Sequence, residues 1–219
     1  MIAEALRGWA QQIQLRVDDE GWARLETLAQ QWRRYAAAFN LVGDSSDAAL
    51  VEYVREGLMA VEAVERSLEP GTTWGWVDVG SGAGIPGLVV GAARVARVRL
   101  IEPREKRAAF LDVCMRSVCR GQADVLRARV KHSTWNESVV DGVFSLGKTE
   151  KLVVSAKAVF PPSEWLALAL PNLGPRDRVV VHVAETSATV EGRTPLTVRS
   201  HAGRAVAVLG GEKRPAEEG

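Results

Sequence analysis

The chain has 219 residues, of which 47% are apolar and 25% charged, and its formal net charge is +1. This composition is typical of an ordinary globular protein and excludes disordered, collagen-like and histone-like chains. At this length we expect one compact domain with a small appendage, whose core needs no disulfide or structural metal.

Targeting and membrane signals are not evident in the sequence. No apolar run approaches the roughly 20 residues that span a bilayer. The first residues do not resemble a signal peptide. We therefore expect a cytoplasmic protein with no membrane partner.

Charge is unevenly distributed along the chain. Residues 1–93 carry seven basic and 13 acidic groups, residues 94–131 carry 11 and four, and residues 132–219 carry ten of each. The middle block, residues 94–131, therefore has an excess of seven positive charges in 38 residues. Such a local excess favours an anionic partner.

The cysteines and histidines indicate neither a disulfide nor a metal site. Cys114 and Cys119 are five residues apart in a predicted helix, so their side chains would point about 140° apart. His132, His182 and His201 have no spacing typical of metal ligands. We expect the cysteines to be small buried residues and the protein to bind no metal.

Residues 1–71 are predicted to form an N-terminal helical cap. Apolar residues from Trp22 to Phe39 recur at spacings of three and four, which predicts an amphipathic helix. A second helix is predicted over 48–68, and Glu69-Pro70-Gly71 ends the helical region.

Strands and helices are predicted to alternate from residue 72 to residue 209. The predicted strands cover 76–79, 98–102, 124–130, 141–145 and 178–184, and the predicted helices cover 87–93, 105–120 and 163–170. Residues 194–198 and 205–209 are predicted to form a closing antiparallel pair. This order is typical of an α/β fold with a mostly parallel sheet covered on both faces. Residues 210–219 are predicted to be a flexible tail.

A glycine-rich turn, Gly80-Ser81-Gly82-Ala83-Gly84, follows an apolar strand and precedes a helix. Glycines let the backbone turn sharply and let a ligand approach the positive end of a helix. Glu102 ends the next predicted strand, where a carboxylate can accept hydrogen bonds from both hydroxyls of a ribose. Its alternative role is a strand-end acid that faces water. The segment predicts a nucleotide-type site.

Two cofactors are compatible with this turn. The dinucleotide fingerprint can be placed on Gly82, Gly84 and Gly87, which would indicate a nicotinamide-dependent oxidoreductase. The run Asp-Val-Gly-x-Gly-x-Gly is instead the pattern expected of S-adenosylmethionine-dependent methyltransferases. We favour the methyltransferase.

Three segments together resemble the bacterial RsmG (GidB) family: YAAAFNL at 35–41, VDVGSGAGIPG at 77–87 and LIEPREKRAAFL at 100–111. Members of this family are S-adenosylmethionine-dependent methyltransferases that modify guanine N7 in 16S ribosomal RNA. The resemblance extends from about Trp22 to Leu209. It implies a Rossmann-like class I methyltransferase with a seven-stranded, mostly parallel sheet and an N-terminal helical cap.

The resemblance also implies where the cofactor S-adenosyl-L-methionine lies. Its ribose is expected near Glu102. The remaining contacts are expected from residues in the glycine-rich turn and after the third strand, namely Gly80, Gly82, Gly84, Ile85, Val130 and Lys131. No catalytic residue is named, because guanine N7 attacks with a lone pair that carries no proton, so catalysis is mainly positioning.

The basic block provides a candidate RNA surface. Its phosphate contacts would give affinity for 16S rRNA or the small ribosomal subunit without sequence specificity. For any single arginine the alternative is a solvated basic face. The candidates for substrate binding are Asn40, Arg104, Arg107 and Lys148, with Lys106, Arg116, Arg120, Arg127 and Arg129 nearby in the sequence. Asn40 has the alternative role of ending its helix.

Trp135 and Trp165 are expected in the core, and the protein is expected to be a monomer.

Several positions depart from the family pattern. Tyr53, Glu56 and Gly57 stand where the family has histidine, aspartate and serine, and Lys131 stands where it has glutamate. After the fourth predicted strand, Ser145-Leu146-Gly147 replaces Ser-Arg-Ala, and Lys148 could replace the charge only with a shifted backbone. Later, His182-Val183 replaces a lysine and a glycine. Two alternatives therefore remain: a catalytically impaired or repurposed relative that binds S-adenosylmethionine, and a methyltransferase with another substrate.

Overall fold

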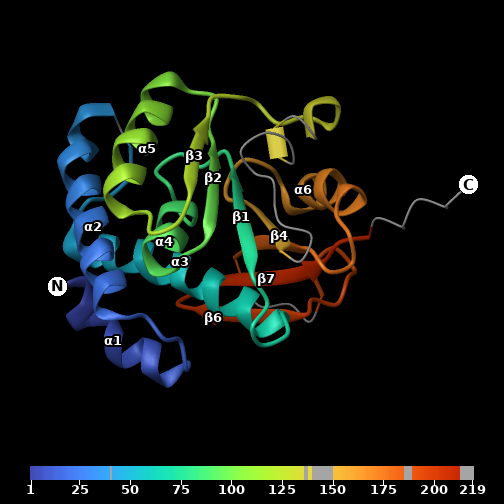
Figure 1. Cartoon of the computed structure of the whole chain (residues 1–219), viewed down its shortest axis with the longest axis horizontal. Coiled ribbons are helices and arrows are strands. Elements are labelled where there is room, and N and C mark those ends of the chain that lie inside the picture. The colour runs from blue at the N-terminus through green and yellow to red at the C-terminus, as the bar shows by residue number, and fades with distance from the viewer. Residues whose placement is uncertain (40, 136–137, 140–149, 185–188, 213–219) are drawn as a thin grey trace, which may run out of the picture.

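A sheet of seven strands forms the centre of the molecule (Figure 1). The computed structural model describes residues 1–39, 41–135, 138–139, 150–184 and 189–212, without the side chains of 37–39. The strand order is β3-β2-β1-β4-β5-β7-β6. Strands β1 to β5 run parallel, and β7 is antiparallel to both β5 and β6. The predicted α/β fold with a seven-stranded, mostly parallel sheet is confirmed. The strands are β1 (Trp74–Val79), β2 (Arg97–Ile101), β3 (Ala123–Leu126), β4 (Lys151–Ala156), β5 (Arg178–Val183), β6 (Thr197–His201) and β7 (Arg204–Gly210).

Helices cover both faces of the sheet, as Figure 1 shows for α2, α4 and α5 on one side and α6 on the other. Alternate residues of β1 point into the two cores, Trp76 toward α1 to α5 and Val77 toward α6. A strand that is buried on both faces is therefore mostly apolar and does not alternate between apolar and polar residues. The helices are α1 (Ile2–Gln12), α2 (Asp19–Phe39), α3 (Asp47–Ser67), α4 (Gly87–Ala93), α5 (Glu105–Val118) and α6 (Pro162–Ala169).

The three N-terminal helices share one continuous hydrophobic cluster with the sheet. Leu6 of α1, Leu25 of α2 and Leu58 of α3 lie in the same cluster as Val98 of β2. This hydrophobic cluster therefore contains residues from both sides of position 71. The division into a cap and a methyltransferase domain at that position stays a prediction. Within the described ranges, no helix is long and apolar enough to cross a membrane.

Asp78 joins β1 to the neighbouring strand β4 and to the beginning of α4. Its side chain is fully buried, and its Oδ1 accepts a hydrogen bond from Ser155 Oγ of β4 at 2.7 Å. Its Oδ2 accepts from the backbone N–H of Gly87, where α4 begins, at 3.2 Å. Burial raises the pKa of Asp78 above its ordinary value, against the hydrogen bonds from Ser155 and Gly87 that lower it.

Several predicted boundaries are corrected by the structure. The strand predicted over 124–130 ends at Leu126, and the one predicted over 194–198 is β6, three residues further on. Helix α1 was not predicted separately. The predicted tail starts too early: Gly210 belongs to β7, and the N–H groups of Gly211 and Glu212 donate to backbone carbonyls.

The largest difference concerns the strand beside β1. The strand predicted over 141–145 falls outside the described residues, and β4, which pairs with both β1 and β5, was not predicted. Its core is the short run Leu152-Val153-Val154, with Lys151 before it and Lys157 after it. A buried parallel strand shows no polar alternation, so periodicity gives little signal for so short a run.

Trp32 fixes α2 to the glycine-rich turn. Its indole ring is completely buried, and its Nε1–H donates to the carbonyl oxygen of Ala83 at 2.7 Å. Tyr53 of α3 packs edge-on against it, with 6.0 Å between the ring centroids. The helices therefore hold the turn through a specific polar contact as well as through apolar packing.

We expect Trp32→Phe to lower the free energy of unfolding by about 1–3 kcal/mol, because it removes ring volume and leaves the Ala83 carbonyl without its donor. Urea unfolding measures this change. Trp9→Phe alters a half-buried ring of the same type and should cost much less. Equal urea midpoints for Trp32→Phe and the wild type would contradict the role of this contact.

Candidate cofactor pocket and its basic rim

A cavity of about 670 Å³ lies at the carboxyl ends of the parallel strands. The chain order reverses between β1 and β4, which is where open α/β sheets bind ligands. The volume lies in the range of small-molecule sites. The lining residues come from four segments: Val79, Gly80, Ser81, Gly82, Ala83 and Ile85; Ile101, Glu102, Pro103, Arg104 and Arg107; Ala128, Arg129, Val130 and Lys131; and Lys157, Ala158, Val159 and Phe160.

The glycines of the turn have different physical roles. Gly80, Gly82 and Gly84 have φ values of 70°, 55° and 83°, a left-handed conformation that favours glycine. A Cβ on Gly84 would lie 2.4 Å from Leu88 Cδ1, so this glycine permits the turn to pack on α4. A Cβ on Gly82 would meet no atom closer than 3.8 Å. Gly82 therefore leaves open space at the pocket.

Glu102 is held rigidly at the end of β2. Its side chain is buried, and its Oε2 accepts from the N–H of Gly82 at 2.9 Å. Its Oε1 accepts from the N–H of Arg104, also at 2.9 Å. An ionised carboxylate has about four lone-pair sites, so it can still accept hydrogen bonds from a ligand. The alternative that Glu102 faces water is wrong.

Apolar side chains form the wall near β3. Val130 and Ile85 are buried and line the cavity with Ile101, while the neighbouring Lys131 is exposed. Trp135 and Trp165 are both buried, with ring centroids 6.2 Å apart. The prediction that these tryptophans belong to the core is confirmed.

The wall near β4 contains a cation that sequence reasoning missed. Lys157 directly follows β4 and lines the cavity, and its Nζ donates to Glu56 Oε2 at 2.7 Å. Val159 and Phe160 line the same side. They were missed because β4 itself was not predicted, although a basic residue after a short apolar run is a signal that could have found Lys157.

The rim of the pocket is basic. Arg104, Arg107, Arg129 and Lys131 line the cavity, and within the described part of the chain none of them forms an ion pair. The structure therefore brings together two of the predicted substrate residues, Arg104 and Arg107, beside the predicted cofactor residues. The other two, Asn40 and Lys148, lie outside the described residues, as does Leu146.

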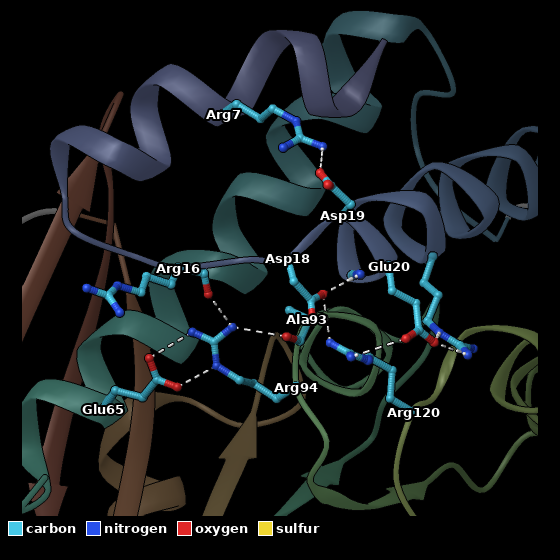
Figure 2. Close-up of polar contacts among 11 residues, drawn as sticks. Arg7, Arg16, Asp18, Asp19, Glu20, Glu65, Ala93, Arg94 and Arg120 are labelled. Carbon is cyan, nitrogen blue, oxygen red and sulfur yellow. Dashed lines mark hydrogen bonds and ion pairs between the residues drawn. The ribbon is translucent and has the colours of Figure 1, made fainter. Parts of the chain in front are cut away.

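Much of the remaining basic block is neutralised by acidic partners. Figure 2 shows Arg94 bound to Glu65 and Arg120 bound to Asp18 and Glu20, with Nη1 of Arg120 2.9 Å from Asp18 Oδ1. These acids belong to the N-terminal acidic segment, residues 1–93. Arg116 and Arg127 likewise contact Asp112 and Glu105. The predicted basic surface is thus narrower than the sequence indicates and is centred on the pocket rim.

Both cysteines are at least partly buried and are not bonded to each other. Cys114 is buried, Cys119 is half-buried and both are free thiols. Burial raises the pKa of each to about 12. In the ranges that the structure describes, no three His, Cys, Asp or Glu side chains are grouped to hold a metal ion.

The pocket fits the predicted cofactor. The open space at Gly82 admits a ligand to the backbone, Glu102 offers acceptors for a ribose, and Ile85, Ile101 and Val130 offer an apolar surface for a base. The chain is also similar in fold to a solved mutant of MtNAS in complex with S-adenosylmethionine. That match has a TM-score of 0.53 at 13% identity and covers 88% of this chain and 72% of that one. Fold and site define a class I methyltransferase of the S-adenosylmethionine-dependent type.

The family is shown by sequence. Residues 22–200 match the family model of GidB, described as rRNA small subunit methyltransferase G, and the chain belongs to this family. Ribosomal RNA small subunit methyltransferase G of Methylobacterium radiotolerans is 35% identical over 72% of this chain and 68% of its own length. The protein of the same name from Cereibacter sphaeroides is 29% identical over 74% of this chain and 71% of its own length.

Alanine substitutions at Gly84 and Gly82 should have separable effects on stability and on cofactor binding. Gly84→Ala places a methyl group against Leu88 and should lower the free energy of unfolding by at least 2 kcal/mol, about the cost of strain and overpacking together. Gly82→Ala should cost only about 1–2 kcal/mol for its left-handed backbone, but should weaken S-adenosylmethionine binding about tenfold or more.

Urea unfolding without ligand and calorimetric titration with S-adenosylmethionine distinguish these two effects. Each variant is the control for the other, because both add one methyl group within the same turn. Wild-type affinity in Gly82→Ala would show that the ligand does not approach this glycine.

Proposed function

We propose that this protein methylates guanine N7 in 16S ribosomal RNA, using S-adenosyl-L-methionine. The observation that carries the proposal is the hydrogen bond between Gly82 of the turn and Glu102, which follows β2, because it joins the glycine-rich turn and the acid expected at a ribose in one pocket. Membership of the GidB family supports the choice of reaction and substrate.

The cofactor residues are proposed from the pocket geometry. Glu102 would accept hydrogen bonds from the ribose hydroxyls, and Val130 and Lys131 would border the adenine. The backbone at the turn, namely Gly80, Gly82, Gly84 and Ile85, would face the remainder of the ligand. All of these residues except Gly84 line the cavity, and Gly84 shapes the turn by packing on Leu88.

The reaction requires positioning more than proton transfer. When bound, the cofactor supplies an electrophilic methyl group. Guanine N7 carries a lone pair and no proton, so this chain needs no general base there. Its residues hold the two reactants in line and exclude water, and both effects can lower the barrier by several kcal/mol. The buried Glu102 and the rigid turn are suited to this task because their hydrogen bonds are already formed.

The basic rim would bind the RNA backbone. Arg104 and Arg107 lie next to the cofactor residues on the segment that follows β2, so a phosphate held there leaves a nearby base within reach of the pocket. Such contacts position an RNA without reading its sequence. Base recognition then depends on other residues, for which Asn40 stays a prediction.

We expect the purified protein to bind S-adenosylmethionine but not NAD, and to transfer labelled methyl groups to small ribosomal subunits or to 16S rRNA that lacks the modification. Nucleoside mass spectrometry would identify 7-methylguanosine. Gly82→Ala is the matched variant, and its methyl transfer should fall at low concentrations of S-adenosylmethionine in line with its weaker binding. Cofactor binding with no methyl transfer to either RNA would favour a catalytically impaired relative, and a different methylated nucleoside would overturn the N7 assignment.

The double variant Arg104→Glu, Arg107→Glu should weaken RNA binding by roughly tenfold or more per charge at 0.1 M salt, and should flatten the dependence of affinity on salt. Filter binding at several salt concentrations measures both quantities. Arg116→Glu is the control, because this exposed residue of α5 is paired with Asp112 outside the pocket. Unchanged affinity and salt slope in the double variant would remove these arginines from the interface.

A further inference from the structure

A buried carboxylate lies directly behind the pocket wall. Glu56 of α3 has only 8% of its side chain exposed, and three cationic or titratable groups from other elements approach it. Lys157 Nζ lies 2.7 Å and Arg204 Nη1 3.2 Å from Oε2, and His182 Nδ1 lies 3.4 Å from Oε1. One acidic side chain thus connects α3 with residues of β5, β7 and the segment after β4.

The ionised form of Glu56 is strongly favoured. Burial would raise its pKa, but the contacts with His182 and Lys157 outweigh burial and lower the pKa to about 2. A buried charge is costly unless it is paired and hydrogen-bonded. Glu56 is therefore a fixed negative charge at neutral pH, around which its partners are held.

Among these partners, only Lys157 belongs to the cavity wall. Its side chain is 25% exposed, and its ammonium has three N–H donors. Within the described part of the chain, the hydrogen bond to Glu56 uses one of them. A lysine is otherwise a flexible point charge on a four-carbon stem. Here the carboxylate fixes the ammonium at the pocket and leaves donors for a ligand.

The sheet order indicates which end of the cofactor would meet this ammonium. In the proposed site, the ribose is at Glu102 after β2 and the adenine is near Val130 after β3. Strand β4 lies on the opposite side of β1 from β2 and β3. The methionine end of an extended ligand that crosses the turn at Gly80 would therefore lie toward Lys157. That end carries a carboxylate.

We propose that Lys157 binds the methionine carboxylate of S-adenosylmethionine, and that Glu56 is the positioning residue that holds the Lys157 ammonium in place. This inference rests on the proposed function, because it requires that cofactor in this pocket. An ammonium that is already fixed loses little conformational freedom when it binds an anion, so pre-positioning increases the affinity.

The test compares two ligands that differ at this end of the molecule. S-adenosylhomocysteine keeps the amino-acid carboxylate, whereas methylthioadenosine lacks it. Calorimetric titration of both ligands into the folded full chain measures their affinity ratio. We expect Lys157→Gln to weaken S-adenosylhomocysteine binding by about tenfold to a hundredfold, the usual range for a charge-assisted hydrogen bond. Methylthioadenosine binding should change less than about twofold.

Matched variants separate binding from folding. Lys151→Gln removes the lysine at the other end of β4, away from the cavity, and should leave both affinities unchanged. Lys157→Arg should restore most of the lost affinity. Glu56→Gln should reduce the affinity ratio in the wild-type background but not in the Lys157→Gln background, because its effect acts through Lys157.

Three results would overturn the assignment. An unchanged affinity ratio in Lys157→Gln, whether neither affinity falls or both fall equally, would mean that Lys157 does not contact the carboxylate. A loss of RNA affinity alone would assign Lys157 to the substrate. Failure of the wild type to bind either ligand would overturn the proposed function as well, whereas normal binding of methylthioadenosine in all variants would leave the proposed function intact.

Discussion

The pocket depends on the hydrogen bonds that Asp78 makes inside the sheet. Its carboxyl group accepts from Ser155 of β4 and from the N–H of Gly87 at the beginning of α4, so one buried group fixes a strand, its neighbour and a helix relative to one another. The glycine-rich turn lies between Asp78 and Gly87, and both of its ends are therefore held. Trp32 adds a third attachment from α2. The rigidity of the turn comes from these contacts, because the glycines themselves favour flexibility.

Most of this arrangement could be predicted from local sequence patterns. The parts that depend on contacts between distant residues could not. An apolar strand, a glycine-rich turn and an acid after the next strand are a sequential signal, and the structure joins Gly82 to Glu102. The position of β4 was missed because its burial on both faces removes the alternation that identifies a strand. The extent of the free basic surface was also misjudged. Arg120 meets Asp18 across about one hundred residues of sequence, and no periodicity reports such a pair.

The missed strand also connects one of the departures from the family pattern with the pocket. When the fourth strand is placed at 141–145, Leu146 stands where the family has an arginine, and Glu56 is an unrelated change. The strand that pairs with β1 instead ends at Ala156 and is followed by Lys157, which binds Glu56. The basic residue at the end of the fourth strand of the sheet order is thus Lys157, and its partner is one of the residues that departs from the family pattern.

The ion pairs between the acidic N-terminal segment and the basic block have a consequence for encounter with an RNA. Arg94 and Arg120 are already paired with acidic side chains of the same chain, so a polyanion that docks there gains little binding free energy. Unbalanced charge remains at Arg104, Arg107, Arg129 and Lys131, beside the pocket. For an RNA that binds at this rim, as proposed, long-range attraction would guide the collision itself, since it acts before any contact forms. The approach would then be biased toward the pocket rather than toward the whole basic block.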